Sequence, residues 1–229
     1  MSGQLTVPQA QSKYATPAVT QQFSQGSSFL PRIQVSSGMS AIVTDGKINV
    51  GRIAFVDGKN VIDFGLKAVA LILAWRPKAV RYEDNSATVA YNPDSPLFSE
   101  IRDAALQGGQ NNPNNFGPEF LVWFPEHGRL AGFFHGNTTL RNEAPLGLGI
   151  FQKQCEESRW VPVIFEIDLI KSKKSGKQWH TTRISEYNSP IPEDKMPNMD
   201  IIGPEIEKFN NPREDEQKEK ADDSSSARD

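Results

Sequence analysis

The sequence predicts an α+β domain rich in strands, folded as an OB-like, partly open barrel with one or two helices and disordered termini. β-favouring runs separated by turn residues recur across positions 29–191 and indicate seven to eight strands. Helices are predicted at 97–106 and in the second half of 138–158. The mean hydropathy of −0.51 is low for a fully packed chain of 229 residues, so part of the chain is expected to lie outside the core.

The composition changes along the chain and divides it into three parts. The first 28 residues are rich in Gln, Ser and Thr, whereas the last residues are mostly charged. Neither end can bury enough apolar surface to offset the entropy lost on ordering. We therefore predict a disordered polar leader at 1–28, a single β-rich domain at 29–191, and an extended to disordered acidic tail at 192–229.

Local patterns place the first elements of the domain. Residues 29–35 predict an edge strand, because Pro31 has no N–H to donate to a central ladder. Asp57 and Gly58 between two β-favouring runs predict a hairpin. The run 67–76 is apolar almost throughout and stops at a proline, which favours a strand buried on both faces, while its alanines and leucines also allow a short helix.

The middle of the chain adds a strand, a helix and a second hairpin. A strand at 87–91 is followed by turn residues that can cap the helix at 97–106. The aromatic-rich runs 119–124 and 130–134 then predict a hairpin in which Gly128 supplies a positive φ.

The clearest motif is a third hairpin with a basic turn. Residues 160–170 alternate apolar and polar side chains, and 178–184 return after a lysine-rich connection. Four ammonium groups within seven residues, followed by an aromatic ring and a guanidinium, suit phosphate neutralisation combined with base stacking. These residues are Lys171, Lys173, Lys174, Lys177, Trp179 and Arg183. The alternative is a solvated turn with ordinary lysines and a buried tryptophan.

A second group of basic and aromatic residues follows the long apolar strand. Its members are Arg76, Lys78, Arg81, Trp75 and Tyr82. A groove for nucleic acid requires that this group share a face with the basic hairpin, which the sequence alone does not determine. Arg141 is a third basic candidate, for which the alternative is an ordinary surface residue at a helix start.

Enzymatic chemistry finds little support in the motifs. The single cysteine, Cys155, excludes a cysteine-based metal cluster, and the three histidines are scattered outside zinc-ligand spacing. The phosphate-binding G-x-x-x-x-G-K and the nucleophile motif G-x-S-x-G are both missing. We therefore predict a protein that is not an enzyme and that uses no metal and no cofactor.

The best enzymatic alternative is a metal-dependent nuclease, in which carboxylates and a lysine hold a divalent ion. Glu166 and Asp168 share one face of the predicted strand, with Asp94 upstream. Asp168 and Lys171 are three residues apart, so they point to opposite faces of a strand and do not match the acid-x-Lys spacing. Two acids on the polar face of an amphipathic strand are more often simply solvated.

Charge is distributed unevenly along the chain. Of its 28 acidic and 25 basic residues, 12 acidic and 6 basic residues lie in 193–229, which leaves 16 acidic and 19 basic residues for the remainder. An acidic tail on a mildly basic body is typical of nucleic-acid binders that screen themselves or recruit partners, and also of tails that only keep a protein in solution. No run approaches the length of a membrane span.

Five phrases resemble a group of bacteriophage and viral replication-region proteins. They are FLPRIQ at 29–34, AWRPKA at 74–79, GPEFLVW at 117–123, RNEAP at 141–145 and KQWH at 177–180. The resemblance covers about 29–212. It implies a phage single-stranded DNA-binding protein with an OB-fold and stacking aromatics, whose acidic tail contacts replication proteins in the cytoplasm of an infected host cell. The chain departs from the common tail pattern, because it ends SSSARD without a terminal aromatic residue.

We therefore expect a single-stranded DNA-binding protein that acts in phage DNA replication or recombination without sequence preference. The alternative is a non-enzymatic viral interaction or structural protein, in which Trp123, Phe133 and Phe134 are core residues and the chain ends bind a protein partner. The first reading predicts binding that weakens steeply with salt, and the second predicts no intrinsic affinity for nucleic acid. No membrane partner is expected under either reading.

Overall fold

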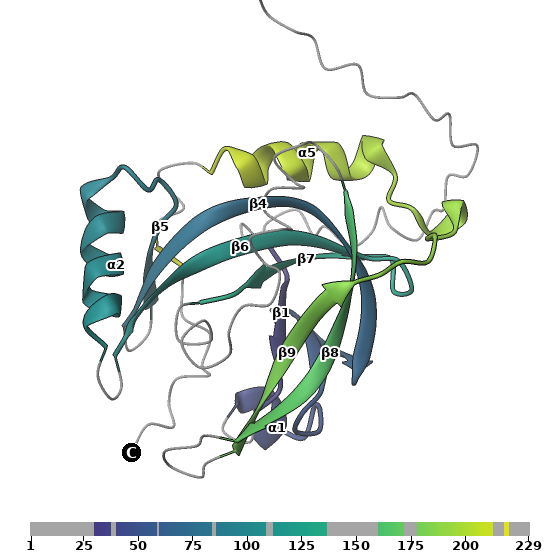
Figure 1. Cartoon of the computed structure of the whole chain (residues 1–229), viewed down its shortest axis with the longest axis horizontal. Helices are drawn as coiled ribbons and strands as arrows, with labels where there is room; N and C mark the ends of the chain where they lie inside the picture. The colour runs from purple at the N-terminus through teal and green to yellow at the C-terminus, as the bar shows by residue number, and fades with distance from the viewer. Residues whose placement is uncertain are drawn as a thin grey trace, which may run out of the picture.

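The computed structural model describes residues 30–37, 40–58, 60–83, 86–108, 112–136, 160–171, 178–212 and 218–219. These residues form a curled, open half-barrel with helices packed against it, which confirms the α+β, OB-like prediction (Figure 1). The described part contains three α-helices, one more than the upper limit predicted: α1 (Ala41–Thr44), α2 (Pro96–Gln107) and α5 (Met199–Asn210). The helix predicted in 138–158 lies outside the described residues, as does the leader at 1–28.

One sheet connects all the described strands. Its main path runs β10-β5-β4-β6-β7-β1-β2-β3, and β8 branches from β4 and pairs with β9. The strands are β1 (Arg32–Val35), β2 (Ile53–Asp57), β3 (Asn60–Gly65), β4 (Lys67–Glu83), β5 (Ser86–Ala90), β6 (Asn114–Phe124), β7 (Arg129–Phe134), β8 (Val161–Lys171), β9 (Gln178–Glu186) and β10 (Lys218–Glu219).

Strand β1 is an internal strand, so its prediction as an edge strand was wrong. It pairs with β2 on one side in antiparallel fashion and with β7 on the other side in parallel fashion. Pro31 does not prevent this pairing, because it precedes the strand and contributes only its carbonyl, which accepts a hydrogen bond from the N–H of Gly132 at 2.7 Å.

The three predicted hairpins are confirmed. β2 pairs with β3, β6 with β7, and β8 with β9, all in antiparallel fashion. Gly58 and Gly128 lie in the first two turns with φ of 55° and 58°, the left-handed conformation that glycine adopts without steric cost.

Strand β4 is longer than predicted and continues through Pro77. Pro77 lies opposite Pro118 on β6, and the Pro118 carbonyl accepts from the N–H of His135, away from β4. The two prolines therefore form a pair in which neither strand needs an N–H from the other. On its other side β4 pairs with β8 only up to Ile72 and with β5 only from Ala79, so the ladders of the described strands require no N–H at position 77.

The two faces of the sheet bury separate cores. The inner face, which carries Ile72, Phe120 and Phe165, encloses the largest core cluster. The outer face carries Leu121 and Trp123 and is covered by α5, which buries Ile202 and Phe209 against it. Figure 1 shows α5 lying along β4 and β6. The register shift between Ile72 and Ala74 explains why the apolar run in β4 hardly alternates.

Helix α5 corrects the expectation of an extended tail from 192 onward. The Asn198 side chain caps its N-terminus by accepting from the N–H of Asp200, and the helix is amphipathic. The short 3-10 helix η1 (Glu193–Lys195) precedes it, and the Lys195 carbonyl accepts from Trp123 Nε1 at 3.0 Å. Burial on the outer face outweighs the acidic composition of this segment.

Helix α2 confirms the helix predicted at 97–106. Ser95 caps it by accepting from the N–H of Phe98, and Pro96 occupies its first turn. Its buried residues Phe98 and Ile101 pack against Ala79 of β4. None of the helices in the described residues is long and apolar enough to cross a membrane.

Candidate nucleic-acid interface

The β8–β9 hairpin projects beyond the rest of the sheet. Strand β8 pairs with β4 up to Glu166, whereas 167–171 of β8 and 178–182 of β9 pair within the described residues only with each other. We call these two segments the arm. The N–H of Ile167 still donates to the Leu66 carbonyl at 2.8 Å, which anchors the base of the arm. In Figure 1 the arm runs downward, away from α5.

The lysine-rich connection joins the two strands of the arm. Lys171 pairs with Gln178 at the end of the ladder, so the six residues 172–177 link the strands directly. Lys173, Lys174 and Lys177 belong to this link, which lies outside the described residues. Arg141, the third basic candidate, belongs to a different segment that also lies outside them. The backbones of Lys171 and Trp179 belong to the ladder, but their side chains are outside the described part.

A row of charged side chains crosses the sheet at the base of the arm. Glu166 is the cross-strand partner of both Lys67 on β4 and Arg183 on β9. Its carboxylate accepts from Lys67 Nζ at 2.7 Å and from Arg183 Nη2 at 3.2 Å. Hydrogen bonds from Lys67 and Arg183 lower the pKa of Glu166 below its usual value. Two exposed cations thus share one carboxylate, and Arg183 is the predicted site residue among them.

The row also bears on the nuclease alternative. Glu166 carries ion pairs to two cations, an arrangement that leaves its oxygens engaged within the protein. Among the described residues, no three His, Cys, Asp or Glu side chains come together in a way that could hold a metal ion. Glu166 therefore has a structural explanation in the ion-pair row, whereas Asp168 is an exposed residue opposite Thr181.

Arg76 and Lys78 are buried around a carboxylate rather than exposed in a groove. Arg76 Nε donates to Glu119 Oε2 at 2.7 Å, and Lys78 Nζ donates to Glu119 Oε1 at 2.9 Å. Burial alone would raise the pKa of Glu119, but the charges of Lys78 and Arg76 outweigh it and hold the pKa below its usual value. This cluster is a structural ion-pair network on the outer face.

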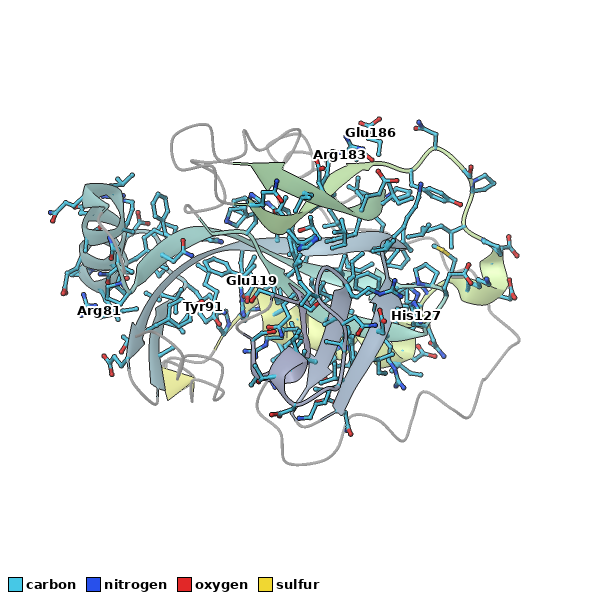
Figure 2. The ribbon with its side chains drawn as sticks, turned by 90° about the horizontal axis from the view of Figure 1, so that it is seen from below. Arg81, Tyr91, Glu119, His127, Arg183 and Glu186 are labelled. Carbon is cyan, nitrogen blue, oxygen red and sulfur yellow. The ribbon has the colours of Figure 1, made fainter. Side chains whose placement is uncertain are left out.

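Arg76 also attaches α5 to the sheet. Its guanidinium carbon lies 3.7 Å from the centre of the Tyr91 ring and 4.1 Å from that of Phe209, and its Nη1 donates to the Phe209 carbonyl at 2.9 Å. Figure 2 shows Tyr91 and Glu119 close together on the sheet. Glu119 and Phe209 were not predicted as partners of Arg76, because they lie 43 and 133 residues from it in the chain and no local pattern links them.

The remaining members of the second group lie at the α2 end or in the core. Arg81 donates to Asn114 at 3.0 Å and to Glu100 of α2 at 2.6 Å. Tyr82 is exposed, whereas Trp75 packs against the inner core. Figure 2 shows Arg81 beside α2 and Arg183 on the β8–β9 hairpin, well separated from each other. Arg81 and Arg183, described members of the two groups, therefore lie apart (Figure 2).

Comparison with known proteins adds no relative. No protein-family model matches the sequence, no curated protein matches it, and no solved structure matches it. The resemblance to phage replication-region proteins therefore stays a prediction.

Proposed function

We propose that the protein binds single-stranded DNA without sequence preference, through the projecting β8–β9 arm. The observation that carries the proposal is the geometry of the arm: two strands that pair only with each other in the described structure, joined by a connection in which four of the seven residues 171–177 are lysines. The β9 strand of the arm packs against the domain, since Thr181 and Thr182 are buried and the His180 ring lies against Gly51. The lysine-rich end is therefore the part of the arm that suits contact with a partner.

Electrostatics favours a polyanionic partner. Lysines that neutralise phosphates release condensed counterions, which drives binding and makes it strongly salt-dependent. Lys67 and Arg183 at the base of the arm add two exposed cations against the single carboxylate of Glu166. OB-type proteins bind single strands with strands and protruding loops of this kind.

The proposal rests on the arm and does not use the second basic group. Arg76 and Lys78 both form ion pairs with Glu119, and Arg76 also contacts α5, so these two cations already have partners within the fold. A binding surface limited to the arm makes few phosphate contacts, so we expect moderate affinity. We propose in addition that the acidic residues beyond α5 contact replication proteins, and that the protein acts in phage DNA replication or recombination.

Fluorescence anisotropy of a labelled oligothymidine, titrated at two salt concentrations, tests the proposal. The Lys173→Glu/Lys174→Glu variant should bind more weakly and show a salt dependence whose slope is smaller by about 1.4, that is ~0.7 for each lost phosphate contact on a single strand. The matched control is Lys47→Glu/Arg102→Glu, which makes the same change in net charge at exposed positions on other elements.

The control separates local contacts from overall charge. If both double variants lose affinity equally, net charge and not the arm governs binding. If the wild-type protein does not bind oligothymidine even at low salt, the proposal is wrong and a protein partner should be sought instead.

A further inference from the structure

The inner face of the arm carries an exposed apolar strip. Leu169 and Leu66 are 53% and 57% exposed, which is unusual for leucines that continue the line of a buried core. Leu169 follows Phe165 and Ile167 at intervals of two along β8, so all three lie on the inner face. The Leu66 carbonyl bonds to Ile167, which places Leu66 beside the same row.

His180 completes the strip on the neighbouring strand. It is the direct cross-strand partner of Leu169, and directly opposed residues share a face. Its ring lies against Gly51, where an added Cβ would come 2.7 Å from Nε2. Gly51 has φ of 73°, so a glycine is favoured there both by the backbone and by the ring. The imidazole is thereby held at a fixed place beside Leu169.

The two faces of the arm and its base differ in chemistry. The outer face carries the charged row of Lys67, Glu166 and Arg183, whereas the inner face carries Leu66, Leu169 and His180. A single-stranded nucleic acid is likewise two-sided, with charged phosphates along its backbone and apolar, stackable base faces. A surface that offers leucine and imidazole next to a lysine-rich connection complements both parts.

We propose that the inner-face strip of Leu66, Leu169 and His180 is the base-contacting surface of the protein. This inference rests on the proposed function, since it assigns the bases a place on the same arm whose lysines are expected to hold the phosphates. The imidazole of His180 can stack on a base of any identity, and the two leucines can pack against its face without reading its hydrogen-bonding edge, which fits binding without sequence preference. The ion-pair row on the outer face braces the arm and leaves the bases to the inner face.

Two ligands that differ only in their bases test the inference. A labelled oligothymidine and an abasic oligonucleotide of the same length carry the same phosphates, and anisotropy titrations give the affinity of the protein for each. The test variant is Leu66→Ala/Leu169→Ala, which alters only exposed side chains. The matched control is Leu106→Ala/Met199→Ala, which removes similarly exposed apolar side chains on α2 and α5.

We expect the wild-type protein and the control to bind oligothymidine about fivefold or more tightly than the abasic ligand. In the test variant this preference should disappear, with affinity for the abasic ligand unchanged. The Lys173→Glu/Lys174→Glu variant should weaken binding of both ligands by the same factor, since it acts on phosphates.

Several outcomes would overturn the inference while leaving the proposed function intact. One is equal wild-type affinity for both ligands, and another is a test variant that keeps the preference for oligothymidine. A third is sedimentation velocity showing a dimer that the test variant disrupts while the base preference stays, which would make the strip an interface between two copies. Failure of the wild-type protein to bind either ligand would instead refute the proposed function itself.

Discussion

Arg76 and Glu119 are cross-strand partners on β4 and β6, and their side chains form a buried ion pair in which Arg76 Nε lies 2.7 Å from Glu119 Oε2. Lys78 reaches the other oxygen of the same carboxylate from two residues along β4. Because the Arg76 guanidinium also donates to the Phe209 carbonyl, this one pair links the centre of the sheet to the C-terminal helix. The same ion-pair cluster therefore stabilises the fold and withdraws the charges of Arg76 and Lys78 from the surface.

Replacing Glu119 should destabilise the protein strongly. Glu119→Ala leaves two buried cations without the carboxylate between them, and breaking a buried pair in this way costs about 3–5 kcal/mol. Urea denaturation followed by circular dichroism measures the loss. Glu100→Ala removes the partner of Arg81 at an exposed site and should cost less than about 1 kcal/mol. Comparable losses in the two variants would show that the buried network is not important for stability.

Truncation of Phe209 should loosen α5. Phe209→Ala removes a ring that is 4% exposed and stacks on Arg76, and a substitution of this kind costs about 3–5 kcal/mol. Met199→Ala, at an exposed position of the same helix, serves as control and should have little effect. Hydrogen exchange of the α5 amides should rise in Phe209→Ala more than that of the β6 amides. Uniform exchange across the protein would mean that α5 does not open separately.

Two glycines should respond to alanine to very different extents. At Gly117 an added Cβ would overlap the carbonyl oxygen of His135, so Gly117→Ala must displace backbone and should destabilise the fold by on the order of 1–3 kcal/mol. At Gly203, inside α5, an added Cβ meets no atom within 4 Å apart from the helix backbone and its two chain neighbours. Gly203→Ala should therefore change the free energy of unfolding by less than about 1 kcal/mol, because the gain in helix propensity is opposed by crowding against the ring of Pro204. Thermal unfolding of both variants measures the difference, and a stable Gly117→Ala would contradict the close approach of β6 and His135.

Stability should fall when the pH is lowered below neutrality because of His135. Burial lowers the pKa of His135 from 6.5 to about 4, since the charged imidazolium is disfavoured in the core. Between these two values the unfolded chain takes up a proton that the folded protein does not, so the contribution is complete above pH 6.5 and is lost as the pH falls toward 4. Urea titrations at pH 7.5 and pH 5 measure it, and His135→Gln should flatten the difference. An equally steep dependence in His135→Gln would assign the effect to other groups.

The negative charge of Glu166 should oppose the binding of a polyanion, so its removal should strengthen that binding. Glu166→Gln leaves Lys67 and Arg183 without a charged acceptor, so the base of the arm becomes more positive, and binding of oligothymidine should strengthen about two- to threefold at low salt. Glu100→Gln makes the same change in an exposed Arg–Glu pair on α2 and is the control. Weaker binding by Glu166→Gln would show instead that the carboxylate orients the two cations for their ligand.

Short-range patterns were enough to predict most of the strands. The turns at Gly58 and Gly128 and the helix capped by Ser95 follow from local conformational preferences, and the structure confirms each of them. Helix α5 was missed because its sequence is rich in charge and contains Gly203 and Pro204, and its stability derives from burying Ile202 and Phe209 on a sheet formed far earlier in the chain. Strand β1 was misplaced because Pro31 was weighed as a member of the strand, whereas it precedes it.

The sequence by itself determined that this is a strand-rich domain with a lysine-rich hairpin, because alternation, turn residues and local charge are properties of neighbouring positions. Only the tertiary structure decided which cations are exposed. The register of β4 against β6 places Arg76 and Lys78 on Glu119, and α5 packs against Arg76 through Phe209. The same sheet leaves Arg183 and the apolar strip of Leu66 and Leu169 exposed. Burial depends on contacts between residues far apart in the chain, and these contacts cannot be predicted from the local sequence pattern.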